Sequence, residues 1–598
     1  MILKCKKYGF SDMITMAFKT SPFYSIIFTA KYIMDALIPT FSIFITANFI
    51  NSAMAVYDKQ ANISSVYIPV ALMAAIMLYN TIIGTIMNFI ECKRNIYFRR
   101  KLVPEILEKR AKLEYRHIEN PKTTDLIERV CPKFPDNIWN MYSQILNAVS
   151  LVIYIMGILI TLFTQVWWIA VSILISGIPI VCISAKTGKR SYDADRELSK
   201  VERRMDYLSG LMKSRENVEE RSMYGYTDEL NNQYGKTFDF MYKRRLKIMA
   251  KNFVKWKTSG FIADIYTIFV MFAMMIPVSN GNIDLGMFIG LMNGVFGLTT
   301  KMSWSMGIID GLVQKREYLK DLTEFTELEE HDGAIDLPDK NMSFNTIEFK
   351  NVSFKYPGTD KLILDDISLT IENGRHYSLV GVNGAGKTTI IKLITGLYTN
   401  YEGEIFVDGR SLRGLTQSEI KGLSSVVYQD FAKYYISLYD NIAIAGENVE
   451  SAIELVGLSN AVAKLKNGLD TPLGKIQENG VDLSSGEWQR VAMARSVVNC
   501  APLKILDEPT AALDPVSESA VYNNFERISK GQTTIFISHR LGSTKLADII
   551  YVLSEGKIIE NGSHSELMTV ENGVYAEMFD SQAEWYKTTV TKEVEINV

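Results

Sequence analysis

The sequence predicts two fold classes in one chain: an α-helical membrane domain in the first half and an α/β domain in the second. Residues 137–185 contain no Asp, Glu, Lys or Arg, and apolar residues concentrate before about residue 310. From about residue 344 the pattern changes to short β-rich runs and amphipathic helices, which is typical of an α/β domain. The 598 residues are too many for one ordinary soluble domain.

Six transmembrane helices are expected before residue 315. A membrane helix needs about 20 apolar residues, so the run 137–185 is long enough for two, with a tight turn near Phe163–Trp168. A large buried helical core is the alternative, but core helices rarely run that far without a charge. The other four expected spans are Phe23–Ile50, Val66–Ile90, Thr258–Pro277 and Leu285–Ile309.

The distribution of basic residues predicts the orientation of these helices. The loop 91–136 holds about a dozen Lys and Arg and the loop 186–257 about eighteen, whereas the loops on the other side hold only Lys59. Basic loops stay on the cytosolic side, so we expect both termini to face the cytosol. The two long basic loops are expected to be charged helices that extend the membrane helices into the cytosol.

Three features inside the predicted membrane helices are unusual. Lys31 and Asp35 lie four residues apart, where an ion pair can form on one helical face. Asp264 lies inside the fifth span, and these charges either line a substrate path or pair structurally. The sixth span carries glycines at every fourth position, which lets another helix approach closely. These glycines are Gly286, Gly290 and Gly294.

The composition excludes some classes of function. A formal net charge of -3 gives no sign of a general nucleic-acid binder. The five cysteines show no C-x-x-C pairing, so neither a zinc site nor a disulfide framework is expected.

The second half contains a phosphate-binding loop. The segment "HYSLVGVNGAGKTTIIKLITGL" predicts a strand, a glycine-rich loop and a helix, and Gly381–Thr388 match the pattern G-x-x-x-x-G-K-[ST]. Such a loop turns its backbone N–H groups toward phosphates, and the helix start adds its positive end. We therefore predict a P-loop nucleotide-binding domain with Mg²⁺ as a cofactor, and the resemblance described below implies that the nucleotide is ATP. The expected nucleotide-binding residues in this segment are Gly381, Val382, Asn383, Gly384, Ala385, Gly386, Lys387, Thr388 and Thr389.

A second motif, "PLKILDEPTAALD", supplies the expected catalytic carboxylates. Asp507 ends an apolar strand and is expected to hold Mg²⁺ together with the Thr388 hydroxyl. Glu508 is placed to polarise the attacking water. Lys504 interrupts the strand; we expect its stem to be buried and its amine to reach the edge, without a functional role.

The segments "GVNGAGKTT", "LSSGEWQR", "ILDEPTAALD" and "IFISHR", in this order and spacing, resemble an ATP-binding cassette (ABC) domain. With six preceding helices on the same chain, the whole resembles an exporter half-transporter. The segment 115–130 is similar to the first cytosolic loop of Gram-positive peptide and lantibiotic exporters. The resemblance implies three parts: 1–315, the transmembrane domain; 316–343, a linker; and 344–598, the ATP-binding cassette.

The resemblance also implies roles for single residues. Tyr356 matches the aromatic residue that stacks on adenine, and Gln429 the glutamine that contacts Mg²⁺ and ATP. His539 matches the catalytic histidine that contacts the γ-phosphate, beside the catalytic Glu508. Ser484 and Gly486 match the signature residues that face ATP held by a second chain. Glu487 stands in the same ATP-binding signature where the family usually has glutamine, and Ser485 where it has glycine.

These matches imply an ATPase coupled to export across the cytoplasmic membrane. The partners implied are a second half-transporter chain, identical or different, the lipid bilayer and the exported substrate, with no nucleic acid. The substrate classes left open are a peptide, a lipid and an amphipathic drug. The alternatives are an ATP-gated channel, a regulatory subunit and a heterodimer-partner subunit. The first two do not need Glu508, and the complete catalytic set argues against them, whereas the third stays open.

Overall fold

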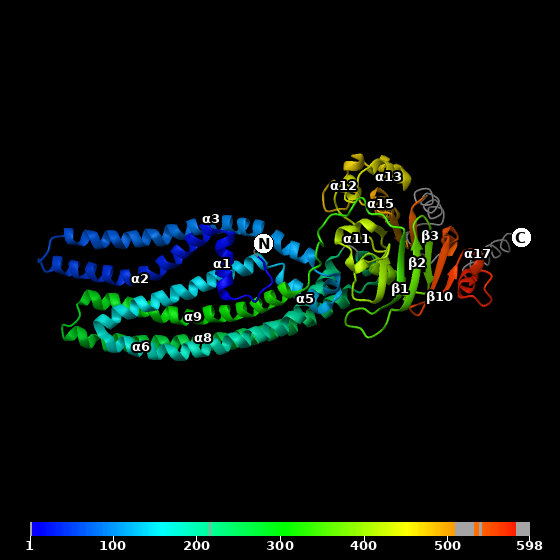
Figure 1. Cartoon of the computed structure of the whole chain (residues 1–598). Helices are drawn as coiled ribbons and strands as arrows, with labels where there is room; N and C mark the ends of the chain where they lie inside the picture. The colour runs from blue at the N-terminus through cyan, green and yellow to red at the C-terminus, as the bar shows by residue number, and fades with distance from the viewer. Residues whose placement is uncertain (1–2, 215–216, 509–530, 538–540, 582–598) are drawn as a thin grey trace. The chain divides into compact units, whose positions relative to one another are not determined.

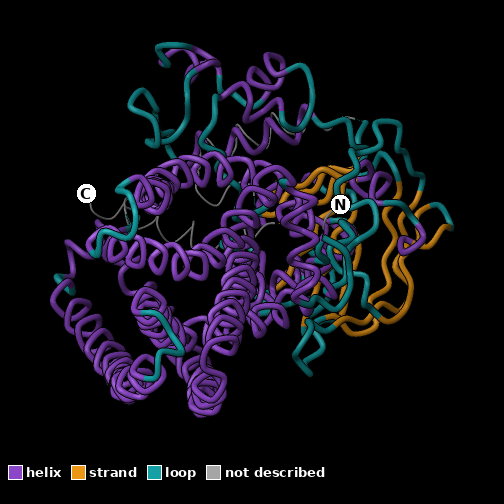
Figure 2. Tube along the Cα trace, turned by 90° about the vertical axis from the view of Figure 1, so that its left-hand side faces the viewer, coloured by secondary structure: helices purple, strands orange, loops and turns teal. Residues whose placement is uncertain are grey.

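The computed structural model describes residues 3–214, 217–508, 531–537 and 541–581. The chain divides into two compact units. Unit 1 comprises residues 1–110 and 125–328, and unit 2 comprises residues 111–124 and 329–598. Helices dominate the first unit, and the strands all lie in the second (Figure 2).

Unit 1 is built from very long helices (Figure 1). Their bounds are α1 (Phe10–Thr20), α2 (Pro22–Tyr57), α3 (Ser64–Lys112), α5 (Pro121–Val130, shared with unit 2), α6 (Phe134–Lys213), α7 (Val218–Tyr224), α8 (Thr227–Ser279) and α9 (Leu285–Glu327). Helix α3 alone has 49 residues, about 74 Å of helix at 1.5 Å per residue. The helices therefore continue well beyond the expected spans, as the basic loops predict.

Within the part of the chain that the structure describes, four helical segments are long and apolar enough to cross a membrane: Pro22–Tyr57, Ser64–Lys112, Phe134–Ser176 and Gly260–Ser279. They coincide with the first, second and fifth expected spans, and with most of the run 137–185, which was expected to form the third and fourth spans with a tight turn between them. The hairpin turn is confirmed, because α6 loses helical geometry at Val166 and the chain reverses direction there (Figure 1). The sixth expected span lies in α9, which is not among the four, so the count of six stays a prediction.

The core of unit 1 forms where α2, α6, α8 and α9 pack together. Helix α3 contributes little to it: 6% of its most apolar window is buried, against 33% for α6. Exposed apolar side chains follow α3 along its length, including Ile68, Met77 and Phe89. Within the described residues, the apolar surface of α3 is therefore available to lipid or to another chain.

The expected intrahelical ion pair is present. The Lys31 ammonium donates to the Asp35 carboxylate at 2.7 Å on α2. The Tyr79 hydroxyl of α3 donates to the other Asp35 oxygen at 3.0 Å, a contact between helices that the sequence does not indicate. The side chain of Asp264 is exposed on α8.

The glycine ladder of α9 is used for close helix packing against α2. A Cβ atom on Gly286 would lie 2.4 Å from the Ala47 carbonyl oxygen, and one on Gly290 would lie 2.6 Å from the Ile43 carbonyl oxygen. Real Cβ atoms do not approach backbone oxygens so closely. The small residues are therefore required by the distance between the two helices.

Substituting Gly290 with alanine is expected to destabilise the protein. The methyl group would push α9 from α2, and overpacking of this kind costs about 1–3 kcal/mol. The control is Gly84→Ala on α3, because a Cβ atom there has no neighbour within 4 Å. Thermal unfolding in detergent should show a lower midpoint for Gly290→Ala only; equal midpoints for the two variants would contradict the ladder.

Among its described residues, unit 2 contains two sheets. The strands are β1 (Thr346–Phe354), β2 (Leu364–Glu372), β3 (His376–Gly381), β4 (Glu402–Val407), β5 (Arg410–Ser411), β6 (Ser424–Val427), β7 (Leu503–Asp507), β8 (Thr533–Ile537), β9 (Ile549–Ser554) and β10 (Lys557–Gly562). One sheet is antiparallel with the order β2-β1-β4-β5. The other has the order β10-β9-β3-β8-β7-β6, and only β10 runs antiparallel in it.

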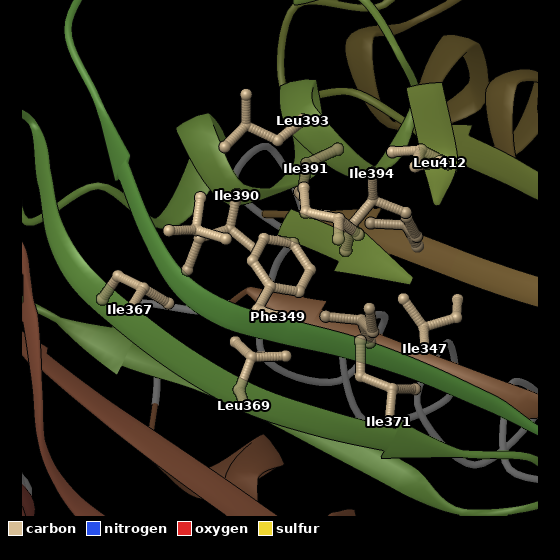
Figure 3. Packing of buried hydrophobic residues seen from close by; sticks show 14 of the residues in the cluster. Ile347, Phe349, Ile367, Leu369, Ile371, Ile390, Ile391, Leu393, Ile394 and Leu412 are labelled. Atoms are coloured by element: carbon tan, nitrogen blue, oxygen red, sulfur yellow. The ribbon is translucent and has the colours of Figure 1, made fainter. Parts of the chain in front are cut away.

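The helices of unit 2 pack on these sheets. They are α4 (Tyr115–Glu119), α10 (Lys387–Ile394), α11 (Gln417–Leu423), α12 (Leu438–Ala443), α13 (Val449–Leu455), α14 (Ser459–Lys464), α15 (Ser485–Val498) and α17 (His564–Leu567). Figure 3 shows Phe349 of β1 and Leu369 of β2 facing Ile390 and Ile391 of α10. This apolar contact fixes α10, the helix that follows the glycine-rich loop.

The segment boundaries differ in detail from the expected division. Helix α9 continues to Glu327, so the expected linker 316–343 begins inside a helix of unit 1. Residues 111–124, which the sequence places in the transmembrane domain, belong to unit 2.

Candidate nucleotide site

The sheet of unit 2 brings the predicted site residues to one edge. Strands β3, β8, β7 and β6 run parallel, and their register aligns Leu379 and Asp507 with Ile537. Gly381 follows two residues after Leu379. The carboxyl ends of these strands therefore meet at one edge, which is where open α/β sheets bind ligands.

The glycine-rich loop leaves β3 in a conformation that needs glycine. Gly384 and Gly386 have φ angles of 84° and 106°. A Cβ atom on Gly386 would lie 2.5 Å from Leu364 Cδ2, whereas one on Gly384 would meet nothing within 4 Å. The loop is thus held against the core at Gly386 and open at Gly384, as a cradle for phosphate requires.

Lys387 is the first residue of α10 and is 6% exposed. Its ammonium donates to the carbonyl oxygens of Gly381 at 2.7 Å and Val382 at 3.1 Å. Burial lowers the pKa of Lys387, and the charges of Glu508 and Asp507 act in the opposite direction. The predicted metal ligand Asp507 and the predicted catalytic Glu508 therefore both stabilise the lysine charge.

The two carboxylates follow the same strand in different environments. Asp507 ends β7 and is 2% exposed. Glu508 has a φ angle of 51°, and its backbone N–H donates to the Ile537 carbonyl oxygen at 2.9 Å. A positive φ in a residue other than glycine is unusual, and such conformations cluster at functional sites.

The remaining predicted residues of the loop divide by exposure. Ala385 and Thr389 are buried, and the exposed residues are Val382, Asn383 and Thr388, the last in the first turn of α10. Gln429 is exposed two residues after β6. His539 lies outside the described residues.

Tyr356 lies in a cluster of aromatic rings beside the loop. Its hydroxyl is 3.1 Å from the Thr389 hydroxyl, and its ring lies edge-on to Tyr398, with 5.6 Å between centroids. The Lys392 ammonium lies 5.1 Å from the Tyr356 ring centroid. The predicted adenine-stacking residue is therefore fixed by its neighbours.

The sequence does not predict the contacts that helix α4 makes with this cluster. The Glu119 carboxylate accepts from Lys392 at 3.0 Å and from the Tyr398 hydroxyl, and the Tyr115 ring packs against Tyr398 at 5.5 Å. The segment 115–130 drew attention in the sequence, but no periodicity or motif pairs it with α10.

The signature segment begins helix α15. Ser484 is the N-cap: its hydroxyl accepts from the Glu487 N–H at 3.3 Å, and the Glu487 carboxylate accepts from the Ser484 N–H at 2.8 Å. This is a capping box. Glu487, a departure from the family's glutamine, thus has a structural role that the sequence analysis did not assign.

Lys504 differs from its expected state. The side chain is 2% exposed, and its ammonium donates to the Ser496 carbonyl oxygen at 2.8 Å and to that of Asn499. Burial lowers the pKa of Lys504 to about 8. The prediction that its amine reaches the edge is wrong, because carbonyls at the end of α15 bind it inside the unit.

Replacing Lys387 with alanine is expected to weaken ATP binding about 10- to 100-fold, because a charge-assisted contact to phosphate is worth about 1.5–3 kcal/mol. Equilibrium binding of a fluorescent ATP analogue measures the change. Lys466→Ala, an exposed lysine elsewhere in unit 2, is the control. Unchanged affinity in Lys387→Ala would refute the assignment.

Comparison with known proteins agrees with this architecture. A family described as ABC transporter matches residues 364–511. The subtilin transport ATP-binding protein SpaT of Bacillus subtilis is 26% identical over 90% of this chain and 88% of its own. An ATP-dependent lipid A-core flippase of Shigella flexneri is 31% identical over 72% of this chain and 73% of its own. A bacterial Atm1-family ABC exporter solved with ATP bound has a TM-score of 0.79 at 21% identity, covering 93% of this chain and 98% of the other.

Long apolar helices joined to an α/β unit with a phosphate-binding loop define a membrane protein that binds ATP. The similarity to the flippase over more than two thirds of both chains settles the family. The chain belongs to the ABC transporter family, and its fold is that of the exporter type.

Proposed function

We propose that the chain is one half of an ATP-hydrolysing exporter that works as a dimer in the cytoplasmic membrane, with both termini in the cytosol. One observation carries the proposal: Lys387, Asp507 and Glu508 all lie at the carboxyl edge of one parallel sheet, at the ends of β3 and β7, next to a glycine cradle. Phosphoryl transfer to water needs this combination of a phosphate grip, a metal carboxylate and a base.

Each residue then has a defined task. The open backbone at Gly384 and the Lys387 ammonium bind the β- and γ-phosphates, and the Tyr356 ring stacks on adenine. Thr388, Gln429 and Asp507 would hold Mg²⁺, which neutralises charge on the phosphates when it is bound. The donor set fits this ion, since hydroxyl, amide and carboxylate oxygens are the ligands that Mg²⁺ takes.

Glu508 acts as the general base toward the attacking water, and His539 contacts the γ-phosphate. Ser484 and Gly486 are proposed to face the ATP of the second chain. The exposed position of Ser484 at the start of α15 supports this role, because a helix N-terminus attracts an anion. The exposed apolar surface of α3 supports a second chain in the membrane.

The substrate class follows from the relatives. SpaT is named for subtilin transport and the flippases for lipid A-core, so we propose an amphipathic peptide or lipid as cargo. An ATP-gated channel is the second candidate. The presence of Glu508 favours the exporter, since a channel needs ATP binding but no base.

Vesicles with the cassettes outward distinguish the two candidates. Three fluorescent probes would be offered: an amphipathic peptide, an NBD-labelled phospholipid and a rhodamine dye. An exporter accumulates at least one of them against its gradient, and only while ATP is hydrolysed. Downhill flux that persists in Glu508→Gln with ATP bound would favour the channel.

Glu487→Gln is expected to improve the enzyme. Glutamine retains an oxygen for the capping box and removes a negative charge beside the proposed phosphate position. Charge effects at partly exposed sites are worth about 0.5–1 kcal/mol, so the KM for ATP should fall about two- to fivefold. Steady-state phosphate release measures it.

The matched control is Glu566→Gln. Ser563 and Glu566 form the same capping box at α17, with the carboxylate accepting from the Ser563 N–H at 2.8 Å. Replacing Glu566 tests the effect of altering a capping box at a helix where no phosphate is proposed to bind. An equal fall in KM for both variants, or no fall for Glu487→Gln, would contradict the charge argument.

A further inference from the structure

A polar cavity lies inside unit 1, between α2, α6 and α9. Its volume is about 410 Å³, within the range of small-molecule sites. Its polar lining consists of Asp35, Gln144, Asn147, Ser150, Tyr154 and Lys301. Amide and hydroxyl groups are rare on membrane helices without a function, because burying them unpaired in apolar surroundings is costly.

Among the described residues of this lining, the one acidic group, that of Asp35, is already bound. One Asp35 oxygen accepts from the Lys31 ammonium at 2.7 Å, and the other accepts from the Tyr79 hydroxyl at 3.0 Å. A cationic ligand would have to replace Lys31 and leave that half-buried ammonium without its partner, which is unfavourable. Asp35 therefore does not favour a cationic ligand.

Lys301 is in a different state. Its ammonium lies 5.9 Å from the centroid of the Tyr154 ring, also part of the lining. Among the described residues, no carboxylate forms an ion pair with Lys301. Counting Lys31, Asp35 and Lys301 gives two positive charges and one negative charge, so the described charges in and beside the cavity sum to +1.

We propose that this cavity binds an anionic head group, a phosphate or a carboxylate, of the amphipathic molecule that the proposed exporter transports. Lys301 supplies the counter-charge, and the Gln144 and Asn147 amides donate hydrogen bonds to the anion's oxygens. The Lys301 side chain is exposed on α9, so its ammonium is accessible to the oxygens of an anionic ligand. That the bound molecule is exported rests on the proposed function, whereas its binding in this cavity does not.

Binding is tested without ATP, on the full-length protein in lipid nanodiscs. A dansyl-labelled alkyl phosphate is displaced by four ligands with the same twelve-carbon chain: dodecyl phosphate, dodecanoate, dodecyltrimethylammonium and dodecyl maltoside. The two anions should compete at least about tenfold better than the other two, since a charge-assisted contact is worth about 1.5–3 kcal/mol. Equal competition by the cation would overturn the proposal.

Variants assign the charge. Lys301→Gln should weaken dodecyl phosphate about tenfold, and Lys301→Arg should restore it. Lys257→Gln is the control, because Lys257 also lies over an aromatic ring, that of Phe253, but does not line the cavity. Unchanged affinity in folded Lys301→Gln would overturn the proposal.

The Lys31–Asp35 pair is tested by removing both charges at once in Lys31→Gln/Asp35→Asn, which leaves the sum at +1. Affinity for dodecyl phosphate should stay within about twofold of wild type, a difference of about 0.4 kcal/mol. A loss as large as that of Lys301→Gln would overturn the assignment of Lys301 as the counter-charge.

Further measurements distinguish a free phosphate ion from a head group as the ligand, and failure of this proposal from failure of the proposed function. Inorganic phosphate that displaces the probe at concentrations near those of dodecyl phosphate would show a site for the free ion, and would overturn the head-group assignment. Anion-selective binding in a protein that hydrolyses no ATP would refute the proposed function and leave this proposal standing, whereas export of neutral probes alone would do the reverse.

Discussion

Glu508→Gln is expected to lose ATP turnover by about 10²–10⁴-fold while ATP binding stays intact, because general-base catalysis commonly contributes a factor of this size. Glu508 directly follows the buried Asp507, at the edge of the sheet where the phosphate loop also begins. Glutamine has nearly the same shape but takes no proton. Phosphate release from purified protein, together with binding of a fluorescent ATP analogue, measures both effects.

The control addresses the unusual backbone at this position. Glu508 has a φ angle of 51°, and Glu555, in the turn between β9 and β10, has a φ angle of 48°. Glu555→Gln therefore makes the same exchange in the same backbone conformation, in the turn after β9 rather than at the end of β7, and Glu555 is not a predicted site residue. Its turnover should equal that of wild type. Turnover near wild type in Glu508→Gln would remove the general base from the mechanism.

Features within one element were predictable from the sequence. The Lys31–Asp35 ion pair follows from a spacing of four on one helix, and the close approach at Gly290 follows from a ladder of the same spacing. The fold of the glycine-rich loop follows likewise from its own eight residues. In each case the residues concerned lie at a spacing in the sequence that the helical turn, or the motif itself, fixes.

Contacts between distant segments were not predictable. Glu119 and Lys392 are 273 positions apart, and Tyr79 reaches Asp35 from another helix. No periodicity relates such positions, because tertiary packing decides which faces meet. Glu487 shows a further limit: comparison with the family motif marks it as a departure, whereas the capping box with Ser484 is visible only in the local hydrogen bonds.

Pairing a Ser484→Arg chain with a Lys387→Ala chain is expected to restore ATP hydrolysis that neither variant has alone. Under the proposed head-to-tail dimer, each ATP lies between the phosphate loop of one chain and the signature of the other. In the mixed dimer one composite site holds both defects. The other holds the intact Lys387 of the first chain and the intact Ser484 of the second.

The layout of unit 2 is consistent with this separation of roles. Helix α10, which begins with Lys387, packs on β3, whereas α15, which follows Ser484, packs on α12, α13 and β6. Ser484 is exposed and Lys387 is buried. The exposed N-terminus of α15 lies on a different part of unit 2 from α10, the helix that follows this chain's phosphate loop. Such an N-terminus is suited to binding an anion that another molecule holds.

The mixed dimer must be isolated before it is assayed. Two different affinity tags, purified in sequence, yield only dimers that contain both variants, and a Ser563→Arg chain controls for loss of a capping box elsewhere. If each chain instead bound ATP with its own phosphate loop and its own signature segment, every site in the mixed dimer would carry one defect and no activity would return. The assembled mixed dimer should therefore hydrolyse ATP if each site is shared between two chains, and should show no hydrolysis if each site lies within one chain. The same design serves a heterodimer, with the two substitutions placed in turn on each of the two different chains.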